Sequence, residues 1–314
     1  MTGLPMPNEL DSKLKIDGIL CQAQGTKFGE AAYFCRQGRR HYLRAPSHLS
    51  GLGKIWPNDV IQVPEAVLDA FAVGSIVPGI NSAQDMDTFQ TDSSIVMREC
   101  MASVLSDRGI EIGAGASPFP VPLHCQVLYG DQLSYAELLD HRYPGQSQHE
   151  MPVPDVTTSL DTLEGIADDS MNFIIACHVI EHTKSPIGAI VAAWKKLRKG
   201  GYLLLVVPDK ERTFDKERPL TTLPHLIADF ENYDRARDYQ HYEEFYQLAF
   251  PQQENVYRSV VDKAFRSNGD IHYHVWNRDS FMTMVSHINE HIIRWTEITS
   301  RASLGIEFYV RLRK

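Results

Sequence analysis

The sequence predicts an α/β fold built on a parallel sheet, with a small β-rich domain ahead of it. Two observations predict the sheet. Apolar segments expected as strands alternate with segments expected as helices, and strands separated by helices form parallel βαβ units. The first of these strands, 110–112, runs directly into Gly113-Ala-Gly115. Glycines in the first strand-to-loop turn are typical of sheets that bind a nucleotide-like ligand.

Residues 1–80 form the expected β-rich domain. Its predicted elements are strands at 14–24, 31–43 and 59–63, a turn at Gln37-Gly38, and a helix at 64–74 with Pro at its start and Gly at its end. Residues 81–107 follow as a polar linker at 81–90 and a helix capped by Thr91-Asp-Ser-Ser. Met97, Met101 and Val104 form the apolar stripe of that helix.

Residues 108–314 carry the alternating pattern. The expected strands are 110–112, 126–129, 153–157, 171–177 and 202–207, and the expected helices are 134–140, 187–197 and 279–287. Two final strands, 293–299 and 305–312, are joined by a short segment and are expected to pair antiparallel. An insertion at about 209–270 is rich in charged and aromatic residues. Because it follows a strand, we expect a substrate lid, with a solvated helical hairpin as the alternative.

Composition limits the classes of function. The 314 residues carry a net charge of −9 and a pI of about 5.8, which argues against a broad nucleic-acid-binding surface. No apolar run reaches the length of a membrane span, and the N-terminus lacks a signal-peptide pattern. The five cysteines are odd in number and contain no Cys-x-x-Cys pair. This pattern predicts reduced thiols and a cytoplasmic protein rather than disulfides or a zinc ribbon.

The glycine turn discriminates between nucleotide-like ligands. A dinucleotide site needs a third glycine and an immediate helix, so that the helix N-terminus meets the pyrophosphate. Here Pro118 takes the third glycine position, and Phe119-Pro-Val-Pro122 cannot begin a helix. The sequence also lacks a Gly-Lys-Ser/Thr phosphate loop. A ligand with ribose and adenine but no phosphate remains, and S-adenosylmethionine is such a molecule.

Two acidic residues flank the turn. Asp131 ends the second strand, where an acid hydrogen-bonds ribose hydroxyls, although a solvated turn acid is the alternative. Glu111 ends the first strand. Its carboxylate would bind the ligand's ammonium or orient the glycine loop, because a partly buried carboxylate needs such a partner.

These motifs together resemble the class I S-adenosylmethionine-dependent methyltransferases, in particular a methyltransferase-11-like, glycosyltransferase-associated subgroup. The matching segments, in order, are Glu111-Ile-Gly-Ala-Gly115, Asp131, Ala167-Asp-Asp-Ser-Met-Asn-Phe-Ile-Ile-Ala-Cys-His-Val-Ile-Glu-His182 and Leu197-Arg-Lys-Gly-Gly-Tyr-Leu-Leu-Leu-Val-Val-Pro208. The subgroup resemblance rests on Ser117-Pro-Phe-Pro, Pro208-Asp-Lys-Glu-Arg-Thr-Phe-Asp and Arg218-Pro-Leu-Thr-Thr-Leu-Pro-His225.

The resemblance implies a doubly wound, seven-stranded, mostly parallel sheet of the Rossmann-like methyltransferase type. It implies S-adenosylmethionine as cofactor and a small-molecule or glycan acceptor, methylated at oxygen or nitrogen. The implied cofactor-binding residues are Glu111, Gly113, Ala114, Gly115, Ser117, Asp131, Gln132, Leu160, Asp161, Cys177 and His178.

His178-Val-Ile-Glu181-His182 follows the strand at 171–177. Residues three and four apart share a face of one helical turn, so this turn presents two imidazoles and a carboxylate. Related methyltransferases use a similar turn to bind a divalent ion, and His225 or His241 would complete the set here. The candidate metal ligands are therefore His178, Glu181, His182 and His225. The alternative is that Glu181 and His182 only pack and hydrogen-bond around the cofactor.

An alcohol acceptor must lose its proton as it attacks the methyl group, so a histidine near that methyl matters. The candidate bases are His178, His182 and His225. His272 and His274 form a further pair, either functional or packed at a sheet edge. Two other functions stay open: a catalytically inactive methyltransferase-like binding module, and a metal-dependent hydrolase using the His-x-x-Glu-His motif on a helix.

Overall fold

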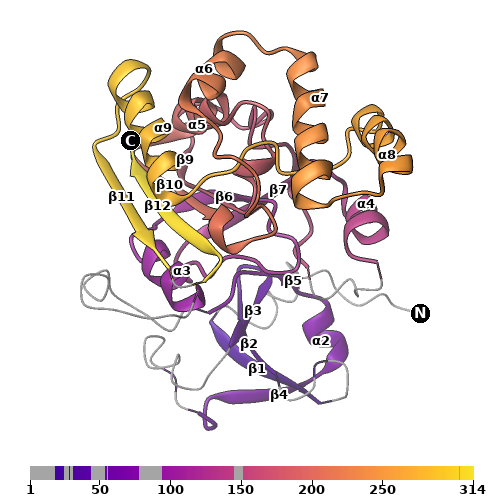
Figure 1. Cartoon of the computed structure of the whole chain (residues 1–314). Coiled ribbons are helices and arrows are strands. Elements are labelled where there is room, and N and C mark those ends of the chain that lie inside the picture. Colours follow the sequence, from indigo (N-terminus) through magenta and orange to yellow (C-terminus); the bar gives the residue numbers. More distant parts are fainter. Residues whose placement is uncertain are drawn as a thin grey trace. The chain divides into compact units, whose positions relative to one another are not determined.

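The computed structural model describes residues 18–24, 28, 31–43, 54, 56–77, 94–144, 151–303 and 305–314. The chain folds into two compact units, Met1–Thr157 and Thr158–Lys314 (Figure 1). The linker expected at 81–90 lies outside the described residues. None of the helices in the described ranges has the length and apolar character needed to cross a bilayer.

The first unit contains a five-stranded sheet with strand order β4-β1-β2-β3-β5. Its elements are β1 (Ile19–Gln24), β2 (Ala32–Arg36), β3 (Arg39–Leu43), β4 (Val60–Pro64), α2 (Glu65–Asp69) and β5 (Ala72–Val73). Gln37 and Gly38 have φ angles of 51° and 71° and join β2 to β3. Positive φ at both central residues matches the twist of a two-residue hairpin, as the turn at Gln37-Gly38 predicts. Helix α2 is shorter than the predicted 64–74 because the chain returns to the sheet as β5.

The first unit also holds α3 (Ser94–Ala102), β6 (Arg108–Ile112), β7 (Gln126–Asp131), α4 (Tyr135–Glu137) and β8 (Val156–Thr157). Strands β6, β7 and β8 pair in parallel. Leu123, just before β7, packs in one apolar cluster with Leu20 and Phe34 of the N-terminal sheet. Arg39 forms an ion pair of 2.8 Å with Asp155. The N-terminal sheet therefore shares a core with the segment around β7, and the domain boundaries expected from the sequence stay predictions.

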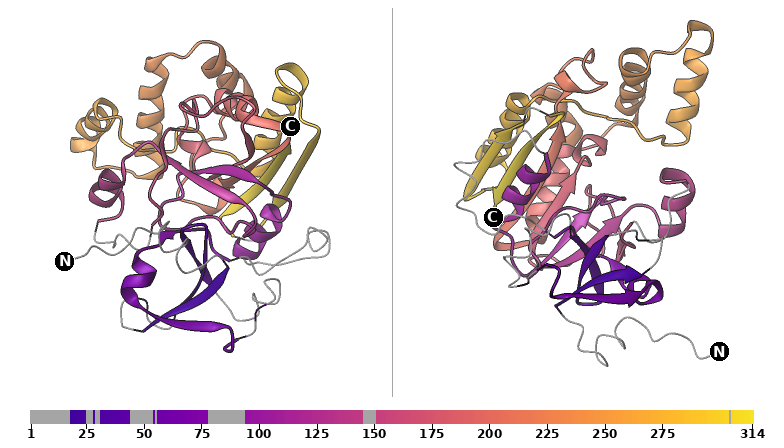
Figure 2. Two further views of the ribbon diagram at one scale, coloured as in Figure 1. Left: turned by 180° about the vertical axis from the view of Figure 1, so that it is seen from behind. Right: turned by 90° about the horizontal axis from the view of Figure 1, so that it is seen from below.

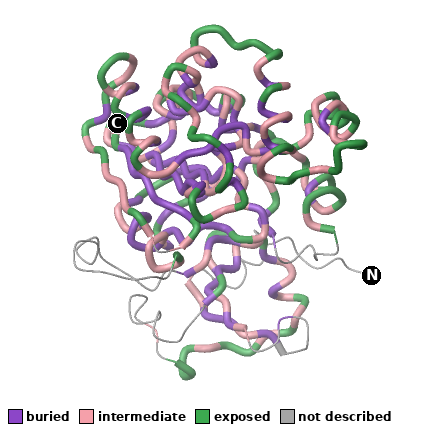
Figure 3. The backbone as a smooth tube through the Cα atoms, in the orientation of Figure 1, coloured by how far each residue is buried: buried purple, intermediate pink, exposed green. Residues whose placement is uncertain are grey.

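The second unit contains β9 (Met171–Cys177), α5 (Pro186–Lys196), β10 (Leu197–Pro208), α6 (Leu223–Glu231), α7 (Arg235–Glu244), α8 (Glu254–Arg266), α9 (Arg278–His291), β11 (Glu297–Ala302) and β12 (Glu307–Arg313). Strand β10 pairs in parallel with β9 and antiparallel with β12, and β11 pairs antiparallel with β12. The interiors of β9 and β10 are buried, which Figure 3 shows in purple. The expected antiparallel pair at the end of the chain is confirmed.

Hydrogen bonding places the strands in the order β11-β12-β10-β9-β6-β7-β8. This is the predicted seven-stranded, mostly parallel, Rossmann-like sheet. The third strand is shorter than the predicted 153–157, because Pro152 and Pro154 lack the N–H groups that a strand ladder uses. The helix predicted at 134–140 begins with a Ser134–Glu137 capping box but widens into a π turn at Leu138–Arg142.

The insertion after β10 contains the helices α6, α7 and α8, drawn in orange in Figures 1 and 2. Helix α7 packs against α8, and α6 packs against α5 and α9. The two ends of the insertion meet, because Asp209 and Trp276 form a parallel bridge and Lys210 donates its N–H to the Trp276 carbonyl at 2.9 Å. The insertion is therefore a helical excursion that leaves and rejoins the structure at one point beside the end of β10.

Candidate active site

The glycine turn of the first unit has the backbone that its sequence predicts. Gly113 and Gly115 have φ angles of 69° and 52°, in the left-handed region that side chains disfavour. Ser117 donates its N–H to Ala114 at 3.1 Å and closes the loop. The phenol of Tyr143 lies so close to Gly115 that a Cβ at this position would overlap the hydroxyl oxygen. Gly115 is therefore required twice, for its φ angle and for the approach of Tyr143.

Glu111 fastens this loop. Its side chain is 1% exposed, and its two oxygens accept the Phe119 N–H at 3.0 and 3.1 Å. Burial raises the pKa of Glu111 to about 8. These contacts support the loop-orienting role of the two that the sequence left open. No helix follows the glycines in this described segment, as the prolines predict.

Asp131 lies at the end of β7, where the ribose-binding acid is expected. Its Oδ1 accepts the N–H of Leu133 at 3.0 Å, and burial raises the pKa of its carboxyl group. Gln132 follows at the strand end. In the second unit, Asp161 accepts the N–H of Lys184 at 3.3 Å beside the buried Leu160. The cofactor roles of these residues stay predictions.

His178 occupies a strained position at the end of β9, directly after Cys177. Its φ angle is 55°, which is uncommon for a residue with a side chain, although His adopts it more readily than most. The N–H of His178 bonds to the Val206 carbonyl of β10 at 2.9 Å and holds this conformation. Its imidazole Nε2 lies 2.7 Å from Oε2 of Glu307, the first residue of β12.

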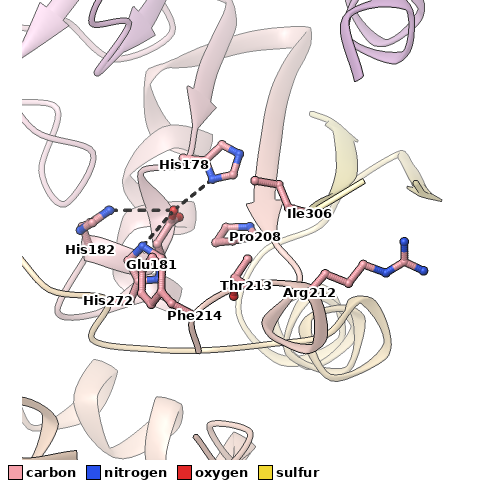
Figure 4. A pocket seen from close by; sticks show the side chains of 9 residues that line it. All are labelled: His178, Glu181, His182, Pro208, Arg212, Thr213, Phe214, His272 and Ile306. Atoms are coloured by element: carbon pink, nitrogen blue, oxygen red, sulfur yellow. Dashed lines mark ion pairs between the residues drawn. The ribbon is translucent and has the colours of Figure 1, made fainter. Parts of the chain in front are cut away.

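Glu181 lies on a 3₁₀ turn, Ile180–His182, and is the centre of the cluster (Figure 4). Its side chain is fully buried, and within the described ranges neither carboxylate oxygen has a hydrogen-bond partner. Its Oε1 lies 3.7 Å from Nδ1 of His178 and 3.9 Å from Nε2 of His182 and of His272. Three imidazoles thus surround one buried carboxylate without bonding to it directly.

Each of these imidazoles is held by another carboxylate on its opposite ring nitrogen. His178 faces Glu307 at 2.7 Å, His182 faces Asp270 at 2.8 Å, and His272 faces Asp215 at 2.6 Å. Such partners fix the ring orientation and make the inward nitrogen a better base or metal ligand. These three carboxylates were not predicted from the sequence, because they lie far from the histidines along the chain.

One sequence-based expectation needs correction, and the hydrolase alternative fails for the reason that the sequence already indicates. His225 is not part of this cluster: its Nε2 lies 3.0 Å from Asp229 and 3.1 Å from Nε2 of His241, in a second group. His272 takes its place, because the extended segment after α8 returns the chain to the turn. The hydrolase alternative required both motif histidines on a continuous helix, whereas His178 follows a strand and His182 ends a 3₁₀ turn. The structure therefore lacks the geometry of that motif.

The cluster lines a pocket of about 230 Å³. The lining residues are His178, Glu181, His182, Pro208, Arg212, Thr213, Phe214, His272 and Ile306. Phe214 is 45% exposed and stacks on His272 with ring centroids 4.8 Å apart. Residues Arg212 to Phe214 belong to the insertion, so the insertion supplies one wall of the pocket. The pocket combines an aromatic wall, a guanidinium and bases, which suits a small polar acceptor.

Comparison with known proteins identifies the family. A family model described as a methyltransferase domain matches residues 93–286, which is more than half of the chain. The chain belongs to this methyltransferase family. It is an S-adenosylmethionine-dependent enzyme of class I, as its motifs predict. The glycosyltransferase-associated subgroup is a finer assignment that this match does not test.

Solved structures give more distant similarities. A methyltransferase from Thermotoga maritima is 14% identical, with 74% of this chain and 88% of that chain covered and a TM-score of 0.38. One from Methanosarcina mazei is 15% identical, with 73% and 96% covered and a TM-score of 0.37. One from Mesorhizobium loti is 11% identical, with 69% and 96% covered and a TM-score of 0.38. Among curated protein sequences, none matches this chain significantly.

Proposed function

We propose that this methyltransferase transfers a methyl group to a hydroxyl oxygen of a small polar acceptor, such as a sugar or a diol, bound in the pocket around Glu181. The observation that carries the proposal is the ring of three oriented imidazoles around a buried carboxylate. An amine acceptor needs little more than alignment, whereas an alcohol requires a base. A pocket so rich in bases is therefore suited to oxygen methylation.

The cofactor supplies an activated methyl group on a sulfonium. We assign its binding in the first unit to Gly113, Ala114, Gly115, Ser117, Asp131 and Gln132, with Glu111 holding the loop. In the second unit we assign it to Leu160, Asp161, Cys177 and the backbone of His178. The left-handed glycines and the fastened loop support this assignment.

His178 is the first candidate for the base. Glu307 holds its Nε2 and leaves Nδ1 on the side of the ring that faces Glu181 and the pocket. A hydroxyl in the pocket would give its proton to this nitrogen as its oxygen attacks. Glu181 would stabilise the resulting imidazolium, because it places a carboxylate 3.7 Å away. His182 is the second candidate base.

The same residues also fit a divalent metal ion. Glu181, His182 and His272 offer two imidazoles and a carboxylate whose donor atoms lie within 4.8 Å of one another, both imidazoles have an outer carboxylate, and the Glu181 oxygens accept no hydrogen bond within the described residues. An ion held there would clamp two acceptor oxygens and lower the pKa of a bound hydroxyl. In this metal role His272 replaces His225.

The experiment follows methyl transfer from labelled S-adenosylmethionine to a panel of sugars, diols, carboxylic acids and amines. We expect label on hydroxylated acceptors, and at least about a 100-fold loss of rate in His178→Ala. His291→Ala is the matched control, because that side chain is 61% exposed on α9. Addition of EDTA and then of single divalent ions tests the metal role. Transfer to amines alone, or full activity in His178→Ala, would contradict the proposal.

A further inference from the structure

A second group of metal-type donors lies within the insertion, apart from the pocket cluster. Helix α6 supplies His225 and Asp229, which share one helix face because they are four residues apart. Helix α7 supplies His241, and the extended segment after α8 supplies His274. One donor atom from each of these four residues lies within 4.8 Å of all the others.

The donor atoms converge closely. Nε2 of His225 lies 3.0 Å from Oδ2 of Asp229 and 3.1 Å from Nε2 of His241. Nε2 of His274 lies 3.8 Å from the same Asp229 oxygen. Zinc bonds to imidazole and carboxylate are ~2.0–2.2 Å long, so the edges of a zinc tetrahedron are ~3.3–3.5 Å. These three separations of 3.0, 3.1 and 3.8 Å lie on either side of that range, and the remaining pairs of donor atoms lie within 4.8 Å.

Hydrogen bonding within the protein leaves this group incomplete. In the described part of the chain, the buried Asp229 Oδ2 has an ion pair of 3.0 Å with His225 but accepts no hydrogen bond of acceptable geometry. His274 Nε2 lies 3.4 Å from the Lys184 carbonyl, which is long for a hydrogen bond. The side chain of His274 is fully buried and that of Asp229 is 4% exposed. A buried carboxylate oxygen without a bonded donor is costly, and a cation would satisfy it.

The surroundings orient the donors for an ion. Asp229 Oδ1 accepts from Nε of Arg237 at 2.6 Å, which holds the carboxylate and leaves Oδ2 for the cluster. The rings of His225 and His241 are nearly perpendicular, at 86°, and those of His241 and His274 are at 78°. Steeply crossed rings bring their nitrogens, rather than their faces, toward a common point.

We propose that His225, Asp229, His241 and His274 form a structural zinc site that joins helices α6 and α7 to the segment leading back into the fold. Three imidazoles and one carboxylate are a complete tetrahedral donor set, and a set filled by protein ligands is structural rather than catalytic. The site stabilises the insertion because its ligands come from separate elements. It is independent of the pocket around Glu181 and of the acceptor proposed above.

The test uses the full-length protein, stripped with EDTA and titrated with Zn²⁺ by calorimetry, and with Co²⁺ by visible absorption. We expect zinc binding in the wild-type chain and in Glu181→Gln, tetrahedral cobalt bands in both, and a rise in Tm of about 5–10 °C with zinc. When His225→Gln/His241→Gln is added to Glu181→Gln, so that the pocket cluster cannot bind the metal, the cobalt bands and the zinc-dependent rise in Tm should disappear. His287→Gln/His291→Gln on α9 is the matched control.

Two outcomes would overturn the site. The first is a folded wild-type protein, checked by circular dichroism, that binds no zinc after EDTA treatment. This outcome does not depend on the folding of any variant. The second is zinc binding that Glu181→Gln removes and His225→Gln/His241→Gln retains, which would assign the metal to the pocket cluster. In that case the four residues form a hydrogen-bonded polar core without an ion.

Discussion

Nε2 of His178 lies 2.7 Å from Oε2 of Glu307, although the two residues are 129 positions apart in the chain. His178 directly follows β9 and Glu307 begins β12, and β10 lies between these strands in the sheet. Glu307 also accepts a hydrogen bond from the Tyr309 hydroxyl. Through Glu307, the sheet thus fixes the orientation of the His178 ring, and Nδ1 of that ring faces Glu181. Glu307 is a positioning residue for the proposed base.

Replacement Glu307→Gln should therefore lower kcat for a hydroxylated acceptor by about 10–100-fold, because the amide holds the imidazole less firmly and in either tautomer. The Kd for S-adenosylmethionine should stay unchanged. Steady-state kinetics with labelled cofactor at several pH values measures kcat. Calorimetry measures the Kd for S-adenosylmethionine. Loss of cofactor affinity in proportion to kcat would indicate a folding defect instead. Glu290→Gln, on an exposed part of α9, is the control.

Gly115→Ala should weaken S-adenosylmethionine binding by at least about 10-fold, because the left-handed backbone at φ 52° costs about 1–2 kcal/mol with a side chain. Overlap of the new Cβ with the Tyr143 phenol adds to this cost. The double variant Gly115→Ala/Tyr143→Ala removes the overlap and keeps the backbone strain. Calorimetry on both variants separates the two effects. Affinity equal to wild type in the single variant would show that the loop does not hold the cofactor.

Glu111 should make the protein less stable at alkaline pH. Its carboxyl group has a pKa of about 8 in the folded chain and about 4.5 when unfolded. At pH values between these two, Glu111 is protonated to a greater extent in the folded chain than in the unfolded chain. The free energy of unfolding therefore falls as the pH rises from about 4.5 to about 8. Urea unfolding at several pH values should show this fall in the wild type and a weaker one in Glu111→Gln. Equal slopes in both proteins would contradict the assignment.

Asp215→Asn should destabilise the protein by about 3 kcal/mol, because it leaves the buried guanidinium of Arg218 without one of its charge partners. The Asp215–Arg218 pair spans 2.8 Å, with side chains 1% and 0% exposed. The Asp168–Lys196 pair also spans 2.8 Å, but Asp168 is 65% exposed. Asp168→Asn should therefore destabilise the protein much less than Asp215→Asn, because solvent screens the exposed pair. Urea unfolding of the two variants measures their free energies of unfolding. It thereby compares two ion pairs of equal length, one buried and one exposed.

Arg237→Gln should weaken zinc binding by about 10–100-fold, because Arg237 holds the Asp229 carboxylate from its outer oxygen. Arg258→Gln on the exposed face of α8 is the control and should leave zinc binding unchanged. Competition with a chromophoric chelator measures both affinities. Arg237→Gln could instead bind zinc as tightly as the wild type, while His225→Gln/His241→Gln added to Glu181→Gln binds none. This result would show that the Asp229 carboxylate does not need Arg237 to hold it.

Local patterns predicted the elements that depend on local chemistry. The strand at 171–177 was predicted with its observed bounds, because its apolar run is buried on both faces. The hairpin turn at Gln37-Gly38 and the left-handed glycines at 113 and 115 follow from backbone sterics that the residue types themselves impose. The third strand is shorter than apolar periodicity predicts, and Pro152 and Pro154 were the residues that indicated this.

The grouping of the histidines was not available from local patterns. His178, Glu181 and His182 are neighbours in sequence, and their proximity was predicted. His272 and His274 are also neighbours, yet one joins the Glu181 cluster and the other joins Asp229. Which cluster each histidine joins depends on how helices α6 and α7 pack beside the extended segment that carries both.

The sequence by itself determined the sheet, the glycine loop and the family of this methyltransferase, because strand periodicity and turn chemistry act over a few residues. The tertiary structure alone decided which carboxylate orients each imidazole and that His225 belongs to a second cluster. Those pairings join residues up to 129 positions apart. They arise only when the sheet order and the packing of the insertion bring distant side chains to one point.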